Sequence, residues 1–385
     1  MLYEQTPHGV LPQALHDELA RQNFIQSLKV HLATKVSPGN KTVYEHRAKA
    51  RFEREHQRAP QDRHEVRRVM KDEPYYQTWS ALLRTSQEMM WDAVAASVER
   101  QLPELTTRTK TNGSTLGSLT LDPTLPIPAY HTAVDVHCQP GGYHTDRGAD
   151  DIAAGAIYDR AVHIYAMGRM GPFNDDLGAS LVMYLQTQHP GLQPQRILDL
   201  GCSVGHSTLP YVDAYPDADV HAVEVGAPML RYAHARAETL GKKVHFSQQN
   251  AEHTNFADGS FDVIVSHILL HETSAKAIRN IMRECHRLLT PGGMMFHVEV
   301  PQYQGMEPYD QFILDWDTYN NNEPFWGTLH DMDLVALAQD SGFAPKQVVQ
   351  TMVPSAFKAA RSRTQLLQGG DFGGGGQWFV FGATK

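Results

Sequence analysis

The chain of 385 residues has little cysteine, no long apolar run and no excess of positive charge. Its three cysteines, Cys138, Cys202 and Cys285, are too few and too scattered for a disulfide framework or a four-cysteine zinc site. No apolar stretch approaches the roughly 20 residues that a membrane-spanning helix needs. The formal net charge of -9 disfavours a protein that mainly binds phosphate. We therefore expect a protein that binds neither membrane nor nucleic acid.

The amino terminus also lacks the basic start and apolar stretch of a secretory signal, which predicts a cytoplasmic location. Histidine, in contrast, is unusually abundant, with 21 residues. So many imidazoles raise the question of whether some of them form a metal site.

The first half of the chain has helical patterns. Residues 1–150 are predicted to form a helical amino-terminal domain that ends in a connector or lid, and residues 151–185 to form linking helices. Apolar residues recur at spacings of three and four between Tyr75 and Leu105, as in a packed helix pair or small bundle. Between 45 and 73, charges of both signs alternate and Pro60 divides two predicted helices. A nucleic-acid-binding arm is the alternative there, disfavoured because the charges nearly cancel.

Residues 186–385 have a different pattern, in which short apolar runs alternate with amphipathic stretches. This alternation predicts a doubly wound, mostly parallel α/β sheet with ligands at the carboxyl ends of its strands. The predicted strands are 196–200, 220–225, 244–246, 261–266, 294–300, 346–353 and 377–383.

A glycine-bearing turn follows the first of these strands. Gly201 and Gly205 stand four apart between an apolar strand and a helix, where backbone can approach a ligand closely. Glu224 ends the next strand, where a carboxylate can accept hydrogen bonds from both hydroxyls of a ribose. A tight turn without a ligand is the alternative, and the two features together disfavour it.

The segment Gln195 to Val300 resembles a class I S-adenosylmethionine-dependent methyltransferase of the small-molecule type, here with a helical amino-terminal extension. The resemblance implies a seven-stranded Rossmann-like sheet and S-adenosyl-L-methionine as cofactor. It also implies a set of cofactor contacts from the first turn, the ribose-binding acid, the adenine loop and the end of the fourth strand: Asp199, Gly201, Ser203, Gly205, Glu224, Asn250, Ala251, Ser266 and His267.

Two positions depart from the family pattern. Ser203 stands where glycine is usual, and Asn250 replaces the commoner aspartate. A serine hydroxyl can donate to the cofactor's carboxylate, and the asparagine oxygen can accept from the adenine amino group. The two departures leave open a protein that binds the cofactor without methylating.

Methyl transfer mainly requires alignment of the nucleophile and exclusion of water, with a general base only when the nucleophile must lose a proton. Among the histidines, His206, His267, His271 and His297 lie near predicted strand ends. His267 and His271 are the candidate catalytic bases. On a helix they would share a face, as in a two-histidine metal site, but no third ligand follows at a telling spacing, so we expect no metal. His297 and Glu299 share a strand face and could satisfy each other.

Substrate walls are expected outside the nucleotide core. The insertion 301–330 is rich in aromatic residues and is predicted to cover the strand ends with Tyr303, Trp316 and Trp326. Tyr143 and Tyr158 are predicted to complete a lid. For the aromatics of the insertion the alternative is a hydrophobic plug or a homodimer contact, and for Tyr143 and Tyr158 it is simple packing.

The resulting hypothesis is methyl transfer from S-adenosylmethionine to an oxygen or nitrogen of a small molecule, with secondary metabolism as the expected setting. One alternative is a cyclase, an isomerase or a structural use of the cofactor. The other is a macromolecule methyltransferase. Methylation of base amino groups is disfavoured because Ser266 to Leu269 replace the Asn/Asp-Pro-Pro-aromatic tetrad of such enzymes.

Overall fold

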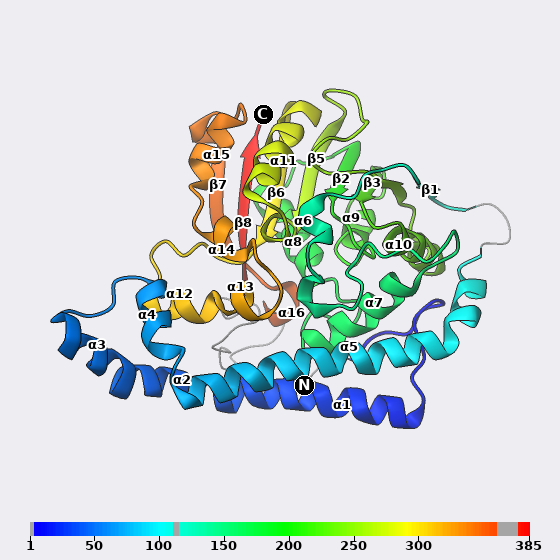
Figure 1. Ribbon diagram of the computed structural model, residues 1–385. Helices are drawn as coiled ribbons and strands as arrows, with labels where there is room; N and C mark the ends of the chain where they lie inside the picture. The colour runs from blue at the N-terminus through cyan, green and yellow to red at the C-terminus, as the bar shows by residue number, and fades with distance from the viewer. Residues whose placement is uncertain (1–3, 111–114, 360–375) are drawn as a thin grey trace.

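A twisted sheet forms the centre of the computed structural model, which describes residues 4–110, 115–359 and 376–385 (Figure 1). In the described ranges the sheet has eight strands in the order β1-β4-β3-β2-β5-β6-β8-β7. All neighbours are parallel except β8, which is antiparallel to β6 and to β7. The strands are β1 Ser118–Thr120, β2 Arg196–Leu200, β3 Asp219–Glu224, β4 His245–Gln248, β5 Phe261–His267, β6 Leu289–Glu299, β7 Val348–Pro354 and β8 Gln377–Thr384.

The seven strands from β2 onward confirm the predicted doubly wound, mostly parallel sheet. The additional strand β1 comes from the predicted connector and pairs in parallel with β4 at the sheet edge. Its three residues are exposed or half-buried and too few to give a clear strand pattern, so the sequence does not reveal it.

Helices cover both faces of the sheet because successive side chains of each strand point to opposite sides. Ile197 packs on one side in a cluster with α8 (Asp176–Gln188), α9 (Leu209–Ala214) and α10 (Ala227–Thr239). Leu198 packs on the other side with α11 (Ala275–Leu288) and α15 (Leu334–Asp340). Both faces are therefore buried, as a parallel sheet requires.

The amino-terminal region contributes α1 (His16–His31), α2 (Ser37–Val43), α3 (Lys49–His56), α4 (Arg63–Met70) and α5 (Pro74–Arg108). The break predicted at Pro60 lies between α3 and α4, as expected. The stretch Tyr75 to Leu105, expected to belong to a packed helix pair or small bundle, lies within the single 35-residue helix α5. Its partner is α1, which runs alongside it below the sheet (Figure 1).

Shorter helices join the amino-terminal region to the sheet. They are α6 (Ala129–Thr132), α7 (Ala153–Tyr165), α12 (Pro308–Leu314), α13 (Trp316–Asn320), α14 (Trp326–His330) and α16 (Ala356–Ala359). Helix α7 packs against both α5 and α10, so one apolar cluster is shared by the amino-terminal helices and the sheet domain. In the part of the chain that the structure describes, no helix combines the length and apolar character needed to cross a membrane.

The carboxylate of Asp159 in α7 connects four segments. It accepts hydrogen bonds from His8 (2.9 Å), His206 (2.7 Å) and Tyr232 (2.8 Å), and Arg236 lies 3.5 Å away. Burial disfavours the ionised carboxylate, but the charge and hydrogen bond of His206, the hydrogen bond of His8 and the charge of Arg236 outweigh it and hold the pKa of Asp159 well below its usual range. The amino-terminal segment, α7, α10 and the turn after β2 are thus joined at one ionised group.

Replacing Asp159 tests this connection. We expect Asp159→Ala to lower the free energy of unfolding by about 3–5 kcal/mol, because it leaves the buried Arg236 without its carboxylate. The exposed Asp150, 3.0 Å from Lys110, is the matched control, and Asp150→Ala should change stability by no more than about 0.5 kcal/mol. Urea denaturation followed by circular dichroism measures both. A loss below about 1 kcal/mol for Asp159→Ala would refute the connecting role.

Candidate functional site

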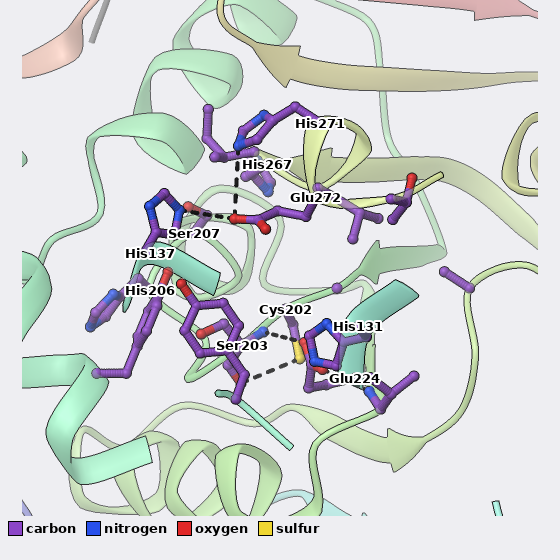
Figure 2. A pocket seen from close by; sticks show the side chains of 18 of the residues that line it. His131, His137, Cys202, Ser203, His206, Ser207, Glu224, His267, His271 and Glu272 are labelled. Atoms are coloured by element: carbon purple, nitrogen blue, oxygen red, sulfur yellow. Dashed lines mark hydrogen bonds and ion pairs between the residues drawn. The ribbon is translucent and has the colours of Figure 1, made fainter. Parts of the chain in front are cut away.

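A cavity lies over the carboxyl ends of β2, β3 and β5, and His131 and His137 of the amino-terminal connector form part of its wall (Figure 2). This is the edge at which a doubly wound sheet binds ligands. Most of the residues predicted for the site line this cavity: Tyr143, Tyr158, Asp199, Gly201, Ser203, Glu224, Asn250, Ala251, His267, His271 and Trp326.

The turn after β2 has an unusual backbone. Gly201 has φ +68°, and a Cβ there would lie 2.5 Å from Leu269 Cδ1, so both conformation and space require glycine. Ser203, the residue that departs from the family pattern, also has positive φ, at +50°. Its backbone N–H donates to Glu224 Oε2 at 3.2 Å. The turn therefore tolerates serine and is bound directly to the end of β3.

Glu224 is held by its own strand end as well. Its Oε1 accepts the backbone N–H groups of Val225 (2.7 Å) and Gly226 (3.0 Å). Its Oε2 accepts only the Ser203 amide among the described residues, which leaves lone-pair capacity for a further donor. A half-buried carboxylate whose Oε2 can accept one further hydrogen bond thus lines the cavity.

Asn250 and Ala251 follow β4 and line the same end of the cavity. The side-chain oxygen of Asn250 accepts the Glu252 backbone N–H at 2.9 Å, so one of its two lone pairs is used within the loop. Tyr130 of the connector also lines the cavity and donates to Glu252 at 3.1 Å. The connector therefore covers the loop that follows β4.

His267 ends β5, where its imidazole joins a buried network. Its Nδ1 lies 3.3 Å from Asp199 Oδ1 and its Nε2 lies 2.9 Å from the Tyr211 hydroxyl. Asp199 in turn accepts from Thr208 at 2.6 Å. Because both ring nitrogens have protein partners, the geometry argues against the predicted role of His267 as a catalytic base.

His267 and His271 do not lie on one helix, so they do not have the spacing of a two-histidine metal site. The chain leaves β5 at His267, Ile268 takes a positive φ of +57°, and His271 follows in the short 3₁₀ turn Leu270–Glu272. His297 and Glu299 do not pair with each other, which was one of the two roles left open for them. His297 Nδ1 bonds the Ser266 hydroxyl at 2.7 Å, and Glu299 bonds His271 Nδ1 at 2.6 Å.

Two predicted cofactor contacts lie outside the cavity lining. The Ser266 side chain is fully buried and turned toward His297 on β6. Gly205 has φ +78°, and a Cβ there would lie 3.5 Å from Phe246, so this glycine shapes the turn against the sheet. The Ser266 side chain and the Cβ direction of Gly205 thus both point toward the sheet.

Two predicted substrate-wall residues also lie elsewhere. Trp316 packs on Trp79 of α5, with ring centroids 5.8 Å apart, and its indole N–H donates to Ser80 at 2.8 Å. Tyr303 donates to Asp315 at 3.0 Å beneath the Arg63 guanidinium, which lies 4.4 Å from its ring centroid. Both correct the prediction that they line the acceptor site. They attach the insertion to the amino-terminal helices, with which Trp316 shares an apolar cluster.

Three other predicted aromatics do line the cavity. Tyr143 and Tyr158 meet edge to face with ring centroids 5.3 Å apart, and Tyr158 stacks on His206 at 5.9 Å. A Cβ at Gly226 would lie 2.6 Å from the Tyr143 carbonyl oxygen, so the connector packs directly on the end of β3. Trp326 lies edge-on to His271 at 4.8 Å.

A buried cluster of histidines and carboxylates lies at one end of the cavity. His137, His271 and Glu272 line the cavity, and Glu323 lies behind them (Figure 2 labels the first three). His137 lies 2.9 Å from both Glu272 and Glu323. Burial disfavours protonation of His137, but the charges of Glu323 and Glu272 outweigh it and raise its pKa well above its usual value.

The sequence did not predict His137 or Glu323 as site residues. His137 belongs to the Thr- and Pro-rich connector, and Glu323 belongs to the aromatic insertion. The adjacent His271 and Glu272 were visible as a pair, but nothing in the sequence places the other two beside them. Only the packing of connector and insertion on the same strand ends brings the four together.

Comparisons with known proteins agree with this architecture. A family model described as a methyltransferase domain matches residues 197–293. The demethylmenaquinone methyltransferase of Thermus thermophilus is 31% identical over 173 residues, which cover 43% of this chain and 71% of that protein. The malonyl-[acyl-carrier protein] O-methyltransferase of Methylococcus capsulatus is 32% identical over 31% of this chain, which spans 42% of that relative. A Haemonchus contortus phosphoethanolamine N-methyltransferase 2 structure, in complex with S-adenosyl-L-methionine, has TM-score 0.41 and 16% identity and covers 59% of this chain and 57% of that chain.

The chain belongs to the class I S-adenosylmethionine-dependent methyltransferases. This confirms the resemblance identified in the sequence, and with it the enzyme class, the Rossmann-like fold and S-adenosyl-L-methionine as the cofactor.

His297 provides a test through pH. Burial, and secondarily the neighbouring His267, lower the pKa of His297 to about 3 from an ordinary 6.5. As pH falls below 6.5 the unfolded chain takes up a proton that the folded chain refuses, so stability is lost between about pH 6.5 and 3. We expect the stability of His297→Asn to fall less steeply than that of the wild type between pH 6 and 4, by about 1.4 kcal/mol per pH unit.

Urea denaturation at several pH values gives the change in unfolding free energy per pH unit for the wild type and for His297→Asn. His16 is 95% exposed, and His16→Ala should retain the wild-type slope. Parallel slopes for His297→Asn and the wild type would contradict a buried neutral imidazole at position 297.

Proposed function

We propose that this protein transfers the methyl group of S-adenosylmethionine to an oxygen or nitrogen of a small molecule. The observation that carries this proposal is one continuous cavity with two chemically different ends. Glu224 and Asn250 lie at one end, and the His137, His271 and Glu272 side chains lie at the other (Figure 2).

The residues at the first end fit the cofactor. Glu224 Oε2 retains acceptor capacity suited to a ribose hydroxyl, and Asn250 keeps one lone pair for an amino group. The Gly201 to Ser203 turn would lie along the methionine part, next to Asp199. When bound, the cofactor supplies a methyl group activated by a positive sulfur. Gly205 and Ser266 are not part of this proposal, because their side chains or Cβ positions face away from the cavity.

The second end would receive the acceptor. Trp326 and Tyr143 supply apolar walls there, and the His137, His271 and Glu272 groups supply polar contacts. The connector forms part of the cavity wall, which would limit access of water to the reacting groups, as methyl transfer requires. A cavity walled in this way suits a small molecule better than a nucleic acid or a protein, which supports the small-molecule acceptor.

The test is product formation. The purified protein is incubated with S-adenosylmethionine and a panel of phenols, enols, carboxylic acids and amines, including hydroxylated quinone precursors. S-adenosylhomocysteine and the methylated product are measured by liquid chromatography and mass spectrometry. Product from at least one acceptor is expected. Tight cofactor binding without S-adenosylhomocysteine from any acceptor would instead favour the alternative, a protein that uses the cofactor without methylating.

Cofactor binding tests the role of Glu224. We expect Glu224→Gln to weaken S-adenosylmethionine binding by about 5- to 150-fold, corresponding to about 1–3 kcal/mol for a hydrogen bond to a charged acceptor. Isothermal titration calorimetry measures the affinity. Glu238 is a suitable control, because its carboxylate bonds the Leu116 and Gly117 backbone outside the cavity lining. Unchanged affinity in Glu224→Gln would remove Glu224 from the cofactor site.

A further inference from the structure

Four side chains from three separate segments converge at the acceptor end of the cavity. They are His137 in the turn before α7, His271 and Glu272 in the turn after β5, and Glu323 between α13 and α14. One nitrogen or oxygen from each lies within 4.8 Å of those from all the others. Two imidazoles and two carboxylates are a donor set suited to first-row divalent metal ions such as zinc, manganese or iron.

His271 is oriented as a metal-binding histidine would be. Its Nδ1 bonds Glu299 Oε2 at 2.6 Å, and Glu299 Oε1 is held by the Leu270 backbone N–H at 2.7 Å. With the proton on Nδ1, the lone pair of Nε2 points into the cluster. A carboxylate behind the imidazole is the usual arrangement around a metal-ligating histidine.

The Nε2 atom of His271 has no hydrogen-bond partner among the described residues, although the side chain is fully buried. The nearest acidic oxygens are Glu323 Oε2 at 3.8 Å and Glu272 Oε1 at 3.9 Å. These separations are too long for hydrogen bonds. Bonds of about 2.1 Å to one shared ion would place its ligand atoms about 3–4 Å apart, which matches both distances.

Glu323 also directs an unused atom into the cluster. Its Oε2 has no hydrogen-bond partner within the described ranges, and the residue is 1% exposed. Its Oε1 is engaged by the Asn321 side-chain amide at 2.7 Å and by His137 Nδ1 at 2.9 Å. The carboxylate is thus fixed through one oxygen and leaves the other facing His271.

His137 completes the set. Its backbone carbonyl accepts the Trp91 indole N–H at 2.6 Å and the Gln87 amide at 3.1 Å, so α5 fixes the position of the residue. Its Nε2 lies 2.9 Å from Glu272 Oε1. That separation suits two adjacent ligands of one ion, and Nδ1 would still donate to Glu323.

The charge balance is compatible with a bound ion. Three carboxylates, Glu272, Glu299 and Glu323, lie around two imidazoles with little access to water. Buried carboxylates of this number are costly unless positive charge accompanies them. Without an ion, protonated imidazoles supply that charge, and a divalent cation bound to the neutral imidazoles would supply it in their place.

We propose that His137, His271, Glu272 and Glu323 bind one divalent first-row transition-metal ion, which reverses the expectation of a metal-free site. Three of these ligands line the cavity, so the ion has an open side toward the acceptor. The acceptor class that suits it is a molecule with an ionisable hydroxyl, such as a phenol or an enol. The ion stabilises the oxygen after its proton has left to solvent, and the oxygen electron pair then forms the bond to the methyl carbon as the carbon–sulfur bond breaks. This acceptor assignment rests on the proposed methyl transfer.

The metal site is tested by binding of the metal alone. After dialysis against a chelator, the full chain is titrated with Zn²⁺ and Mn²⁺ by calorimetry, and metal content is measured by mass spectrometry. Co²⁺ substitution adds a visible absorption spectrum that reports nitrogen and oxygen ligands. We expect one ion per chain, and a loss of affinity of at least 10-fold in Glu323→Gln and in Glu272→Gln. Glu299→Gln, behind His271, should cost about 10- to 100-fold.

The glutamine variants keep side-chain volume, and thermal unfolding checks that each is folded. The matched control is the double variant His16→Ala/Asp17→Asn, which removes an exposed histidine–carboxylate pair (2.9 Å) and should bind the ion as the wild type does. Absence of stoichiometric binding to the wild type, or equal affinity in the wild type, Glu272→Gln and Glu323→Gln, would overturn the proposal.

The readouts also separate this proposal from the proposed function. Ion binding without S-adenosylhomocysteine from any acceptor would contradict the methyl transfer but not the metal site. Unimpaired product formation by metal-free protein that binds no ion would overturn the metal site alone.

Discussion

The hydrogen bonds of the buried Asp159 carboxylate are the interaction on which the site depends most. They tie the amino-terminal segment and α7 to His206 in the turn after β2 and to Tyr232 in α10. The glycine-bearing turn belongs to the sheet domain, whereas Tyr143 and Tyr158 of the cavity wall belong to the residues before it. The ionised Asp159 carboxylate holds these two parts together, because separating them would leave its buried partners without hydrogen bonds.

The two ends of the cavity are built in different ways. The Glu224 end consists of backbone amides and strand-end side chains, which the sheet itself positions. The His137 end consists of side chains from the connector, the turn after β5 and the insertion. A cofactor common to the family would use the first end, and an acceptor particular to this protein the second. Differences in acceptor choice therefore belong to segments outside the sheet.

Much of the fold could be predicted because strand patterns are local. The strand 196–200 was predicted at its observed limits, and the break predicted at Pro60 lies between α3 and α4. The full length of α5 was not predicted, since apolar spacing shows a helical face but not where a helix ends. Trp316 and Tyr303 were misplaced because an aromatic side chain packs equally well against a helix or a ligand.

The sequence by itself determined the methyltransferase class, since the Gly201 turn, Glu224 and the alternation of strands and helices follow from adjacent residues and their regular spacing. It also marked His271 as a histidine near a strand end. Only the tertiary structure decided which histidine nitrogens have protein partners, because that depends on Glu299, Tyr211 and Asp199 from other strands and helices. It likewise brought His137 and Glu323 beside His271, since contacts between distant segments arise from packing and leave no periodic signal in the chain.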